Sequence, residues 1–231
     1  MIERFPELGR LPRIALLQDP TPVEHLPALG REVGNEDLWI KRDDLTAEPY
    51  GGNKPRKLEL GLADILDKGA RTVVTFGGIG TNHGLATAIY ARRLGLDCHL
   101  VLVEQPVDEQ VRQKLRLFHA FGASLHLASG MASAGFKAAR LLVQGLLFAS
   151  RGKVRFLGPG GTSPLTTLGF VNAAFELRDQ IDRKRLPVPS HILPAYKPNA
   201  EEEYYWNDPF IKANLAKVKT LFGITDYGIS M

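Results

Sequence analysis

Residues 72–95 read TVVTFGGIGTNHGLATAIYARRLG, and this stretch decides the fold class. The β-branched run at 72–76 is typical of a buried strand. Residues 77–80 then predict a tight glycine turn, and an apolar helical pattern follows as far as Leu94. Gly95 is placed to end that helix. The stretch therefore predicts one strand–turn–helix unit.

The same alternation of strand and helix continues on both sides of this unit. Apolar periodicity predicts helices at 55–69, 107–121, 132–149 and 165–181, and strands at 38–41, 98–103, 124–127 and 154–157. Strands that alternate with helices through short loops favour a parallel sheet. We therefore expect a three-layer α/β fold with helices on both faces of the sheet.

The character of the chain changes after Ile192. Prolines and the cluster EEEYYW at 201–206 are typical of a surface linker. Asp208 and Pro209 could then start a helix. One apolar face of that helix would carry Ile211, Leu215, Val218 and Phe222. Residues 194–231 are thus predicted to be a divergent tail with one amphipathic helix.

Composition excludes several classes of protein. A hydrophobic content of 44% and a charged content of 23% are ordinary for a globular chain of 231 residues. The net charge of +4 is small and dispersed, which argues against nucleic acid as a partner. No stretch is apolar enough to span a bilayer, and we expect no membrane partner. The single cysteine, Cys98, lies in an apolar strand pattern, which indicates a reduced thiol and a cytoplasmic protein.

A lysine-rich stretch with the sequence GGNKPRKLE lies at 51–59 and is preceded by KRDD at 41–44. A lysine amine is nucleophilic only when neutral, and its ordinary pKa of about 10.4 leaves little of that form at neutral pH. Crowding Lys54 with Arg56 and Lys57 would disfavour its ammonium form, and partial burial would act in the same direction. These conditions suit a lysine that forms a Schiff base. The competing interpretation is a helix start with solvated lysines, although cations are unfavourable at the positive end of a helix dipole.

Together, the motifs at 41–44, 51–59 and 77–83 resemble those of the D-cysteine desulfhydrase and 1-aminocyclopropane-1-carboxylate deaminase family. The resemblance runs from about Phe5 to about Ile192. It implies pyridoxal 5'-phosphate as the cofactor and the tryptophan-synthase-β-like fold, known as fold type II. It also implies a lyase or deaminase that acts on a small amino acid, and a homodimer.

The resemblance also assigns cofactor-binding residues. Lys54 would hold pyridoxal phosphate covalently, and Asn82 would hydrogen-bond the phenolic oxygen of the cofactor. Asn53 and Lys57 are further cofactor-binding candidates. Lys54 released from the cofactor is a plausible base.

The glycine turn at 77–84 is the expected substrate site. By resemblance it receives the substrate carboxylate, with Thr81, Asn82 and His83 as substrate-binding candidates. Thr81 stands where relatives usually carry serine, and His83 stands where they carry histidine or glutamine. Lys54, Thr81 and His83 are therefore the catalytic candidates.

The family pattern is incomplete at its C-terminal end. In the family, a glycine-rich turn binds the cofactor phosphate soon after a strand expected at 190–193. This chain has no glycine between Gly169 and Gly223. We expect a small α/β domain at 56–164 and a partial large domain from 1–55 and 165–193. An inactive family member without retained cofactor is the alternative.

Two further interpretations of the glycine turn stay open. Asn82 could simply cap the helix that follows. Gly78, Gly80 and Gly84 also approach the dinucleotide-binding fingerprint, but the second spacing departs by one residue. The acidic residue that this fingerprint needs could only be Asp97 or Glu104, and Asp97 starts a strand rather than ending one.

Overall fold

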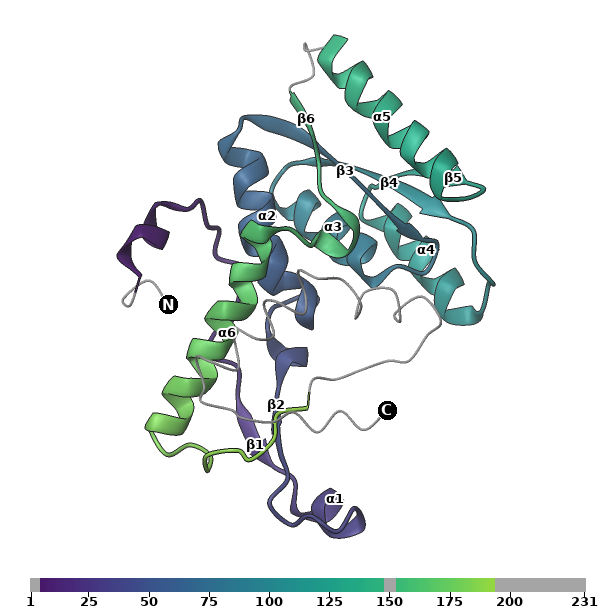
Figure 1. Ribbon diagram of the computed structural model, residues 1–231. Coiled ribbons are helices and arrows are strands. Elements are labelled where there is room, and N and C mark those ends of the chain that lie inside the picture. Colours follow the sequence, from purple (N-terminus) through teal and green to yellow (C-terminus); the bar gives the residue numbers. More distant parts are fainter. Residues whose placement is uncertain (1–4, 148–152, 194–231) are drawn as a thin grey trace. The chain divides into compact units, whose positions relative to one another are not determined.

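A parallel sheet of four strands organises the larger part of the structure (Figure 1). Its strands are β3 (Ala70–Gly78), β4 (Asp97–Val103), β5 (Ser124–Ala128) and β6 (Lys153–Phe156). They are ordered β5-β4-β3-β6, and each neighbouring pair is parallel. The parallel sheet expected from the sequence is confirmed.

The computed structural model describes residues 5–147 and 153–193. The chain packs as two units, the first made of residues 1–22 and 41–170 and the second of 23–40 and 171–231. The sheet belongs wholly to the first unit. The helix expected at 209–222 lies outside the described residues.

Helices cover both faces of the sheet (Figure 1). One face packs against α2 (Asn53–Asp67), α3 (Asn82–Arg93) and α4 (Glu109–Ala120), and the other packs against α5 (Met131–Leu147). Because strand side chains alternate between faces, Val73 joins the core under α2 to α4 while Val74 joins the core under α5. The expected three-layer arrangement is confirmed.

Glycines end the helices of the first layer where the sequence predicted stops. Gly69, Gly95 and Gly122 follow α2, α3 and α4 with φ of 71°, 70° and 76°. These left-handed values are available to glycine without a Cβ penalty, so each residue turns the chain back toward the sheet.

The second unit contains the pair of strands β1 (Val23–His25) and β2 (Trp39–Lys41), joined through α1 (Pro27–Glu32). Near the strand ends, the amide of Leu26 donates a hydrogen bond of 2.8 Å to the carbonyl of Leu38. The long helix α6 (Pro164–Asp182) begins in the first unit and continues in the second. The expected strand at 190–193 was wrong, since these residues form no strand.

Short 3-10 turns complete the described elements. They lie at Pro6–Arg10, Asp43–Leu45 and Pro159–Gly161. The last of these follows β6 and leads into α6.

The order of strands places a topological switch between β3 and β6. The chain proceeds outward from β3 to β4 and β5, and then returns through α5 to the other side of β3. In open parallel sheets, ligands bind beyond the carboxyl ends of the strands at such a switch. Here the segments that follow β3 and β6 are residues 79–81 and 157–163.

Candidate functional site

Lys54 is the second residue of α2. Gly52 precedes the helix with φ of 93°, and Asn53 is its first residue. A side chain at Gly51 would collide with the carbonyl of Asp44, so the turn before the helix requires glycine there. Lys54 is half-buried and Asn53 is exposed. The lysine therefore sits on the first helical turn rather than on the glycine turn itself.

Arg56 is paired with an acidic residue. Its side chain is fully buried, and its Nη2 lies 2.6 Å from Oδ1 of Asp43. Its Nε donates a second bond of 3.0 Å to Oδ2 of the same carboxylate, and Nη2 also donates to Thr21 Oγ1 at 3.3 Å. A bidentate pair of this kind compensates the guanidinium charge. This partner lies thirteen positions away in the sequence, and the sequence analysis did not predict the pair.

Lys57 lies one turn after Lys54 and faces the loop that follows β6. Its Nζ donates hydrogen bonds to Thr162 Oγ1 at 2.8 Å and to the carbonyl of Gly160 at 3.3 Å. The same ammonium lies 5.7 Å from the centre of the Phe170 ring. Burial, and then the charge of Lys54, lower the pKa of Lys57 to about 8. The pKa of Lys57 is thus lowered chiefly by burial, with a further contribution from the neighbouring charge of Lys54.

The turn before α3 is organised by Thr81. Its Oγ1 accepts a hydrogen bond from the amide of Gly84 at 3.2 Å and so caps the helix. Asn82 is the first residue of α3 and is exposed, so the interpretation of Asn82 as the cap was wrong. The side chain of Asn82 accepts a hydrogen bond of 3.3 Å from the Tyr50 hydroxyl. The carbonyl of Tyr50 in turn accepts a bond of 2.6 Å from Tyr90.

His83 is buried on the first turn of α3, with 3% of its surface exposed. Its Nε2 lies 2.9 Å from Oγ1 of Thr75. Its Nδ1 is buried and has no hydrogen-bond partner among the described residues. Burial, followed by the charges of Lys54 and Lys57, lowers the pKa of His83 to about 3. The imidazole is therefore neutral at neutral pH, and one of its polar atoms lacks a partner.

The loop after β6 closes over this histidine. Gly161 has φ of 66°, and a Cβ there would lie 3.0 Å from Cε1 and 3.3 Å from Nδ1 of His83. A larger residue is therefore excluded by both backbone and space. The close approach brings the 159–162 loop, Lys57 and His83 together at the switch between β3 and β6.

The glycines of the supposed dinucleotide fingerprint have packing roles. A side chain at Gly78 or Gly80 would collide with Gln105, and one at Gly84 would collide with Thr81. Lys114 Nζ also donates to the carbonyl of Gly80 at 2.8 Å. Contacts within the chain therefore explain these glycines without a dinucleotide.

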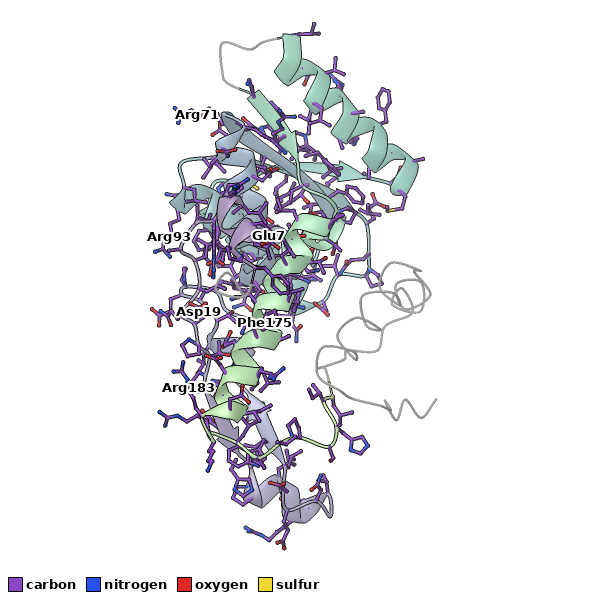
Figure 2. All side chains as sticks on the ribbon, turned by 60° about the vertical axis from the view of Figure 1, so that its left-hand side comes forward. Glu7, Asp19, Arg71, Arg93, Phe175 and Arg183 are labelled. Atoms are coloured by element: carbon purple, nitrogen blue, oxygen red, sulfur yellow. The ribbon has the colours of Figure 1, made fainter. Side chains whose placement is uncertain are left out.

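Two exposed arginines of this unit contrast with the site lysines. Arg71 and Arg93 are exposed, and Figure 2 shows their side chains projecting outward from the ribbon. Lys54 and Lys57 are half-buried, and their charges act on each other and on His83. Partly buried positive charge of this kind favours an anionic ligand.

These residues fit pyridoxal phosphate in charge and chemistry. The cofactor carries an aldehyde, a phosphate and a phenolic oxygen, which suit a lysine amine, partly buried cations and an asparagine amide. The unpartnered Nδ1 of His83 is a further polar atom that a ligand can satisfy. Asn82 lies beside Tyr50, whose hydroxyl fixes its amide. The arrangement can therefore hold an anionic aldehyde, with Lys54 as the group that bonds to it.

The sequence analysis missed two residues of this site, namely Tyr50 and Thr75, whereas the turn at 158–163 that contains Thr162 was expected by resemblance to border the cofactor cleft. Each missed residue is an ordinary one with no motif of its own, and its role depends on a contact with a residue distant in sequence. Only the position of Tyr50, directly before the glycine pair, could have drawn attention to it.

The described residues offer neither a metal site nor a membrane-spanning helix. They contain no cluster of three or more His, Cys, Asp or Glu side chains that could hold a metal ion. Among the same residues, no helix combines the length and the apolar character needed to cross a membrane.

Several known proteins are similar to this chain. The profile of a family described as pyridoxal-phosphate dependent enzymes matches residues 14–195. A Pyrococcus horikoshii protein named as a candidate 1-aminocyclopropane-1-carboxylate deaminase is 39% identical over 181 residues, covering 78% of this chain and 54% of the relative. A D-cysteine desulfhydrase of Salmonella paratyphi B is 36% identical over 181 residues, covering 76% of this chain and 54% of the relative.

The fold matches a solved structure as well. The crystal structure of a homologue of 1-aminocyclopropane-1-carboxylate deaminase superposes with a TM-score of 0.66 at 39% identity, covering 76% of this chain and 53% of that one. The predicted fold type II is thereby confirmed. The chain spans about half the length of the relatives that it matches.

Proposed function

Because this chain belongs to the family of pyridoxal-phosphate-dependent enzymes, we propose that it is a lyase or deaminase acting on a small amino acid. The two reactions suggested by its relatives are desulfhydration of D-cysteine and opening of the ring of 1-aminocyclopropane-1-carboxylate. We place the reaction at the switch between β3 and β6. Cytoplasmic location and a homodimer are further parts of the proposal.

One observation carries this proposal. Lys54 and Lys57 lie close enough to His83 for their charges to lower the pKa of its buried imidazole. His83 also presents a buried Nδ1 without a partner in the described part of the chain. Partly buried positive charge beside a buried polar atom without a partner is typical of binding sites.

The chain's own residues then take distinct roles. When bound, pyridoxal phosphate supplies an electron sink for the carbon that loses a substituent or a proton. Lys54 would hold the cofactor covalently, and its amine, when free of that link, would carry a proton between substrate atoms. Lys57 would contribute positive charge toward the phosphate. Asn82, oriented by Tyr50, would donate its amide to the phenolic oxygen, and Asn53 would line the same side.

The substrate would bind on the α3 side of the site. The helix N-terminus presents amides that suit a carboxylate, and Thr81 and His83 lie on that first turn. A neutral His83 can donate a hydrogen bond without adding charge. With D-cysteine, the thiol leaves the β-carbon as sulfide, and water then releases ammonia and pyruvate.

We further propose the domain assignment predicted from the sequence. Residues 56–164 would form the small α/β domain of the family fold, and residues 1–55 and 165–193 would form part of the large domain.

The test is chemical trapping of the covalent link. Purified protein would be incubated with pyridoxal phosphate, reduced with borohydride and digested, and the modified peptide would be identified by mass spectrometry. We expect modification at Lys54, with a visible absorption band before reduction. Lys57→Arg should keep the modification, whereas Lys54→Arg should abolish it.

Activity would be measured separately by sulfide and pyruvate release from D-cysteine and by ammonia release from 1-aminocyclopropane-1-carboxylate. Modification at Lys54 without turnover of either compound would leave cofactor binding intact and would point to another small amino acid. A protein that shows no modification at Lys54 is the inactive family member instead.

A further inference from the structure

Thr75 is a buried polar residue of β3 that the proposed chemistry does not use. Its side chain is fully buried, and its Oγ1 lies 2.9 Å from Nε2 of His83. Because strand side chains alternate between faces, Thr75 points to the same face of the sheet as Val73, which α2, α3 and α4 cover. The hydroxyl therefore meets the imidazole between the sheet and the first turn of α3.

This contact is the single hydrogen bond that either side chain makes within the described residues. Oγ1 of Thr75 bonds to Nε2 of His83 and to no other atom there. On the other side of the ring, Nδ1 is buried without a partner. The hydrogen-bond pattern therefore decides which ring nitrogen carries the proton.

A neutral imidazole has one proton, on either Nε2 or Nδ1. If Nε2 held it, the ring would donate to Thr75, and both the hydroxyl hydrogen and Nδ1 would lack a partner. If Nδ1 holds it, the hydroxyl donates to Nε2 and only the Nδ1 proton lacks a partner. Each buried polar group without a partner costs about 1–3 kcal/mol. Protonation on Nδ1 is therefore the more stable arrangement.

We propose that Thr75 is a positioning residue that holds His83 as the tautomer protonated on Nδ1, so that the ring offers a fixed hydrogen-bond donor to an oxygen of the substrate. This inference deepens the proposed function and rests on it for the identity of the ligand. It gives His83 a role in binding and leaves proton transfer to Lys54, because a protonated Nδ1 has no lone pair to accept a proton.

The Nδ1 edge of the ring faces the loop that follows β6. A Cβ on Gly161 would lie 3.3 Å from Nδ1, so this glycine covers the nitrogen but supplies no acceptor. Lys57 holds the same loop through Thr162 Oγ1 and the carbonyl of Gly160. A substrate oxygen would reach Nδ1 when residues 159–162 shift outward, and it would then satisfy the buried donor.

The charges of the two site lysines oppose this tautomer. Lys54 and Lys57 both act on His83, and positive charge favours a lone pair over an N–H group that faces it. Lys57 contacts the loop on the Nδ1 side of the ring. Without the hydroxyl of Thr75, we therefore expect the proton to move to Nε2. A substrate carboxylate gains from both the donor and the cations.

Nuclear magnetic resonance of the full chain without cofactor tests the tautomer. The histidines would be labelled with ¹⁵N, and long-range ¹H–¹⁵N correlations recorded at about pH 7, where His83 is neutral. The chain has six histidines, and His83→Gln identifies the signals of His83 by their loss. We expect one tautomer, protonated on Nδ1. A proton on Nε2, or a mixture of comparable populations, overturns the proposal.

Substitutions in β3 test the role of the hydroxyl. Thr75→Val replaces it with a methyl group and should move the proton to Nε2, whereas Thr75→Ser should keep the wild-type tautomer. Thr72→Val is the matched control, because Thr72 is a buried threonine of the same strand that makes no hydrogen bond to His83 within the described residues. A wild-type tautomer in Thr75→Val, or its loss in Thr75→Ser, overturns the proposal. The wild-type spectrum decides by itself should Thr75→Val not fold.

Kinetics test whether the donor serves the substrate. In protein that borohydride traps at Lys54, kcat/KM reports on the free enzyme. For Thr75→Val it should therefore fall by the same factor as the population protonated on Nδ1, about tenfold when about nine tenths of the protein has lost that proton. A shifted tautomer with unchanged kcat/KM overturns the donor role. Absence of trapping at Lys54 contradicts the proposed function instead, and the spectrum without cofactor still decides the tautomer.

Discussion

His83 combines burial with two nearby positive charges, and both disfavour the imidazolium. In an unfolded chain the histidine would titrate near its ordinary pKa of about 6.5, whereas in the folded protein the pKa is about 3. Between about pH 3 and pH 6.5, the unfolded chain therefore carries a proton on His83 that the folded chain does not carry. Stability contributed by neutral His83 is therefore complete above pH 6.5 and is lost as the pH falls toward 3.

We predict that His83→Gln reduces the acid sensitivity of the protein. The loss of unfolding free energy between about pH 6.5 and pH 4 should be smaller in the variant than in wild type by on the order of 2 kcal/mol. Urea denaturation at both values measures it. His119→Gln changes an exposed histidine and should keep the wild-type loss. An NMR titration showing His83 protonated near pH 6.5 would contradict the prediction.

The pKa of Lys57 is also lowered in the folded protein, so the stability of the fold again increases as the pH rises, but in a higher pH range than for His83. Its folded pKa of about 8 lies below its ordinary value of 10.5, so its charge destabilises the fold below pH 8, and this cost disappears as the pH rises toward 10.5. We predict that Lys57→Met shows a smaller gain in unfolding free energy between about pH 7 and pH 10 than wild type, by about 1 kcal/mol. Guanidinium denaturation at both values is the measurement.

The control for this experiment is Lys68→Met, which removes an exposed lysine that pairs with Asp64 across one helical turn. The unfolding free energy of that variant should increase between the same two pH values by as much as that of the wild type. An identical gain in Lys57→Met and wild type would show that the charge of Lys57 is not disfavoured in the fold.

At the scale of single residues, the sequence predicted which residues belong to the site better than it predicted the residues that they contact. The motifs identified Lys54, Lys57 and His83 as neighbours in one site because glycine turns and helix starts lie close to them. The ion pair of Arg56 with Asp43 and the hydrogen bond of Tyr50 to Asn82 depend on long-range packing. No local pattern encodes such contacts.

Elements with a clear period were predicted, and so was the short strand β2, but β1 and α1 were not. The strands β3 to β6 and the helices α2 to α6 each carry a β-branched run or a helical apolar pattern, often with glycine at the end. By contrast, β1 and α1 contain three and six residues, too few to display a period. Their formation depends on tertiary contacts rather than local propensity.

At the scale of helices and strands, we make a prediction about the close packing of α6 against α2. In α6, a Cβ on Gly169 would collide with the carbonyl of Arg56 in α2. The position tolerates no side chain, because the obstacle is backbone. We predict that Gly169→Ala destabilises the fold by about 1–3 kcal/mol, the usual cost of overpacking. Thermal and urea denaturation measure the change.

Gly135 in α5 is the matched control, since it is also within a helix but has open space around its Cβ position. Gly135→Ala should stabilise by about 0.5–1 kcal/mol through the lower entropy of the unfolded chain. Equal effects of the two substitutions would show that α2 and α6 do not approach each other this closely.

For the molecule as a whole, the site matters because it joins segments that are far apart in sequence. Residues 50–57, 75–83 and 159–162 meet at the switch between β3 and β6, all within the first unit. A ligand that contacts all three segments binds only the folded chain. Its binding free energy therefore adds to the stability of the whole unit.

We predict that pyridoxal phosphate raises the melting temperature of the protein. At a hundredfold excess over the dissociation constant the gain is about 2.7 kcal/mol, or about 5–10 °C for a chain of this size. Pyridoxal lacks the phosphate and inorganic phosphate lacks the aldehyde, so each should give a smaller shift at the same concentration. Lys54→Ala should lose the aldehyde contribution and Lys57→Ala the phosphate contribution. Shifts of equal size from inorganic phosphate and pyridoxal phosphate would mean that the lysines form a simple anion site, and that Lys54 has no covalent role.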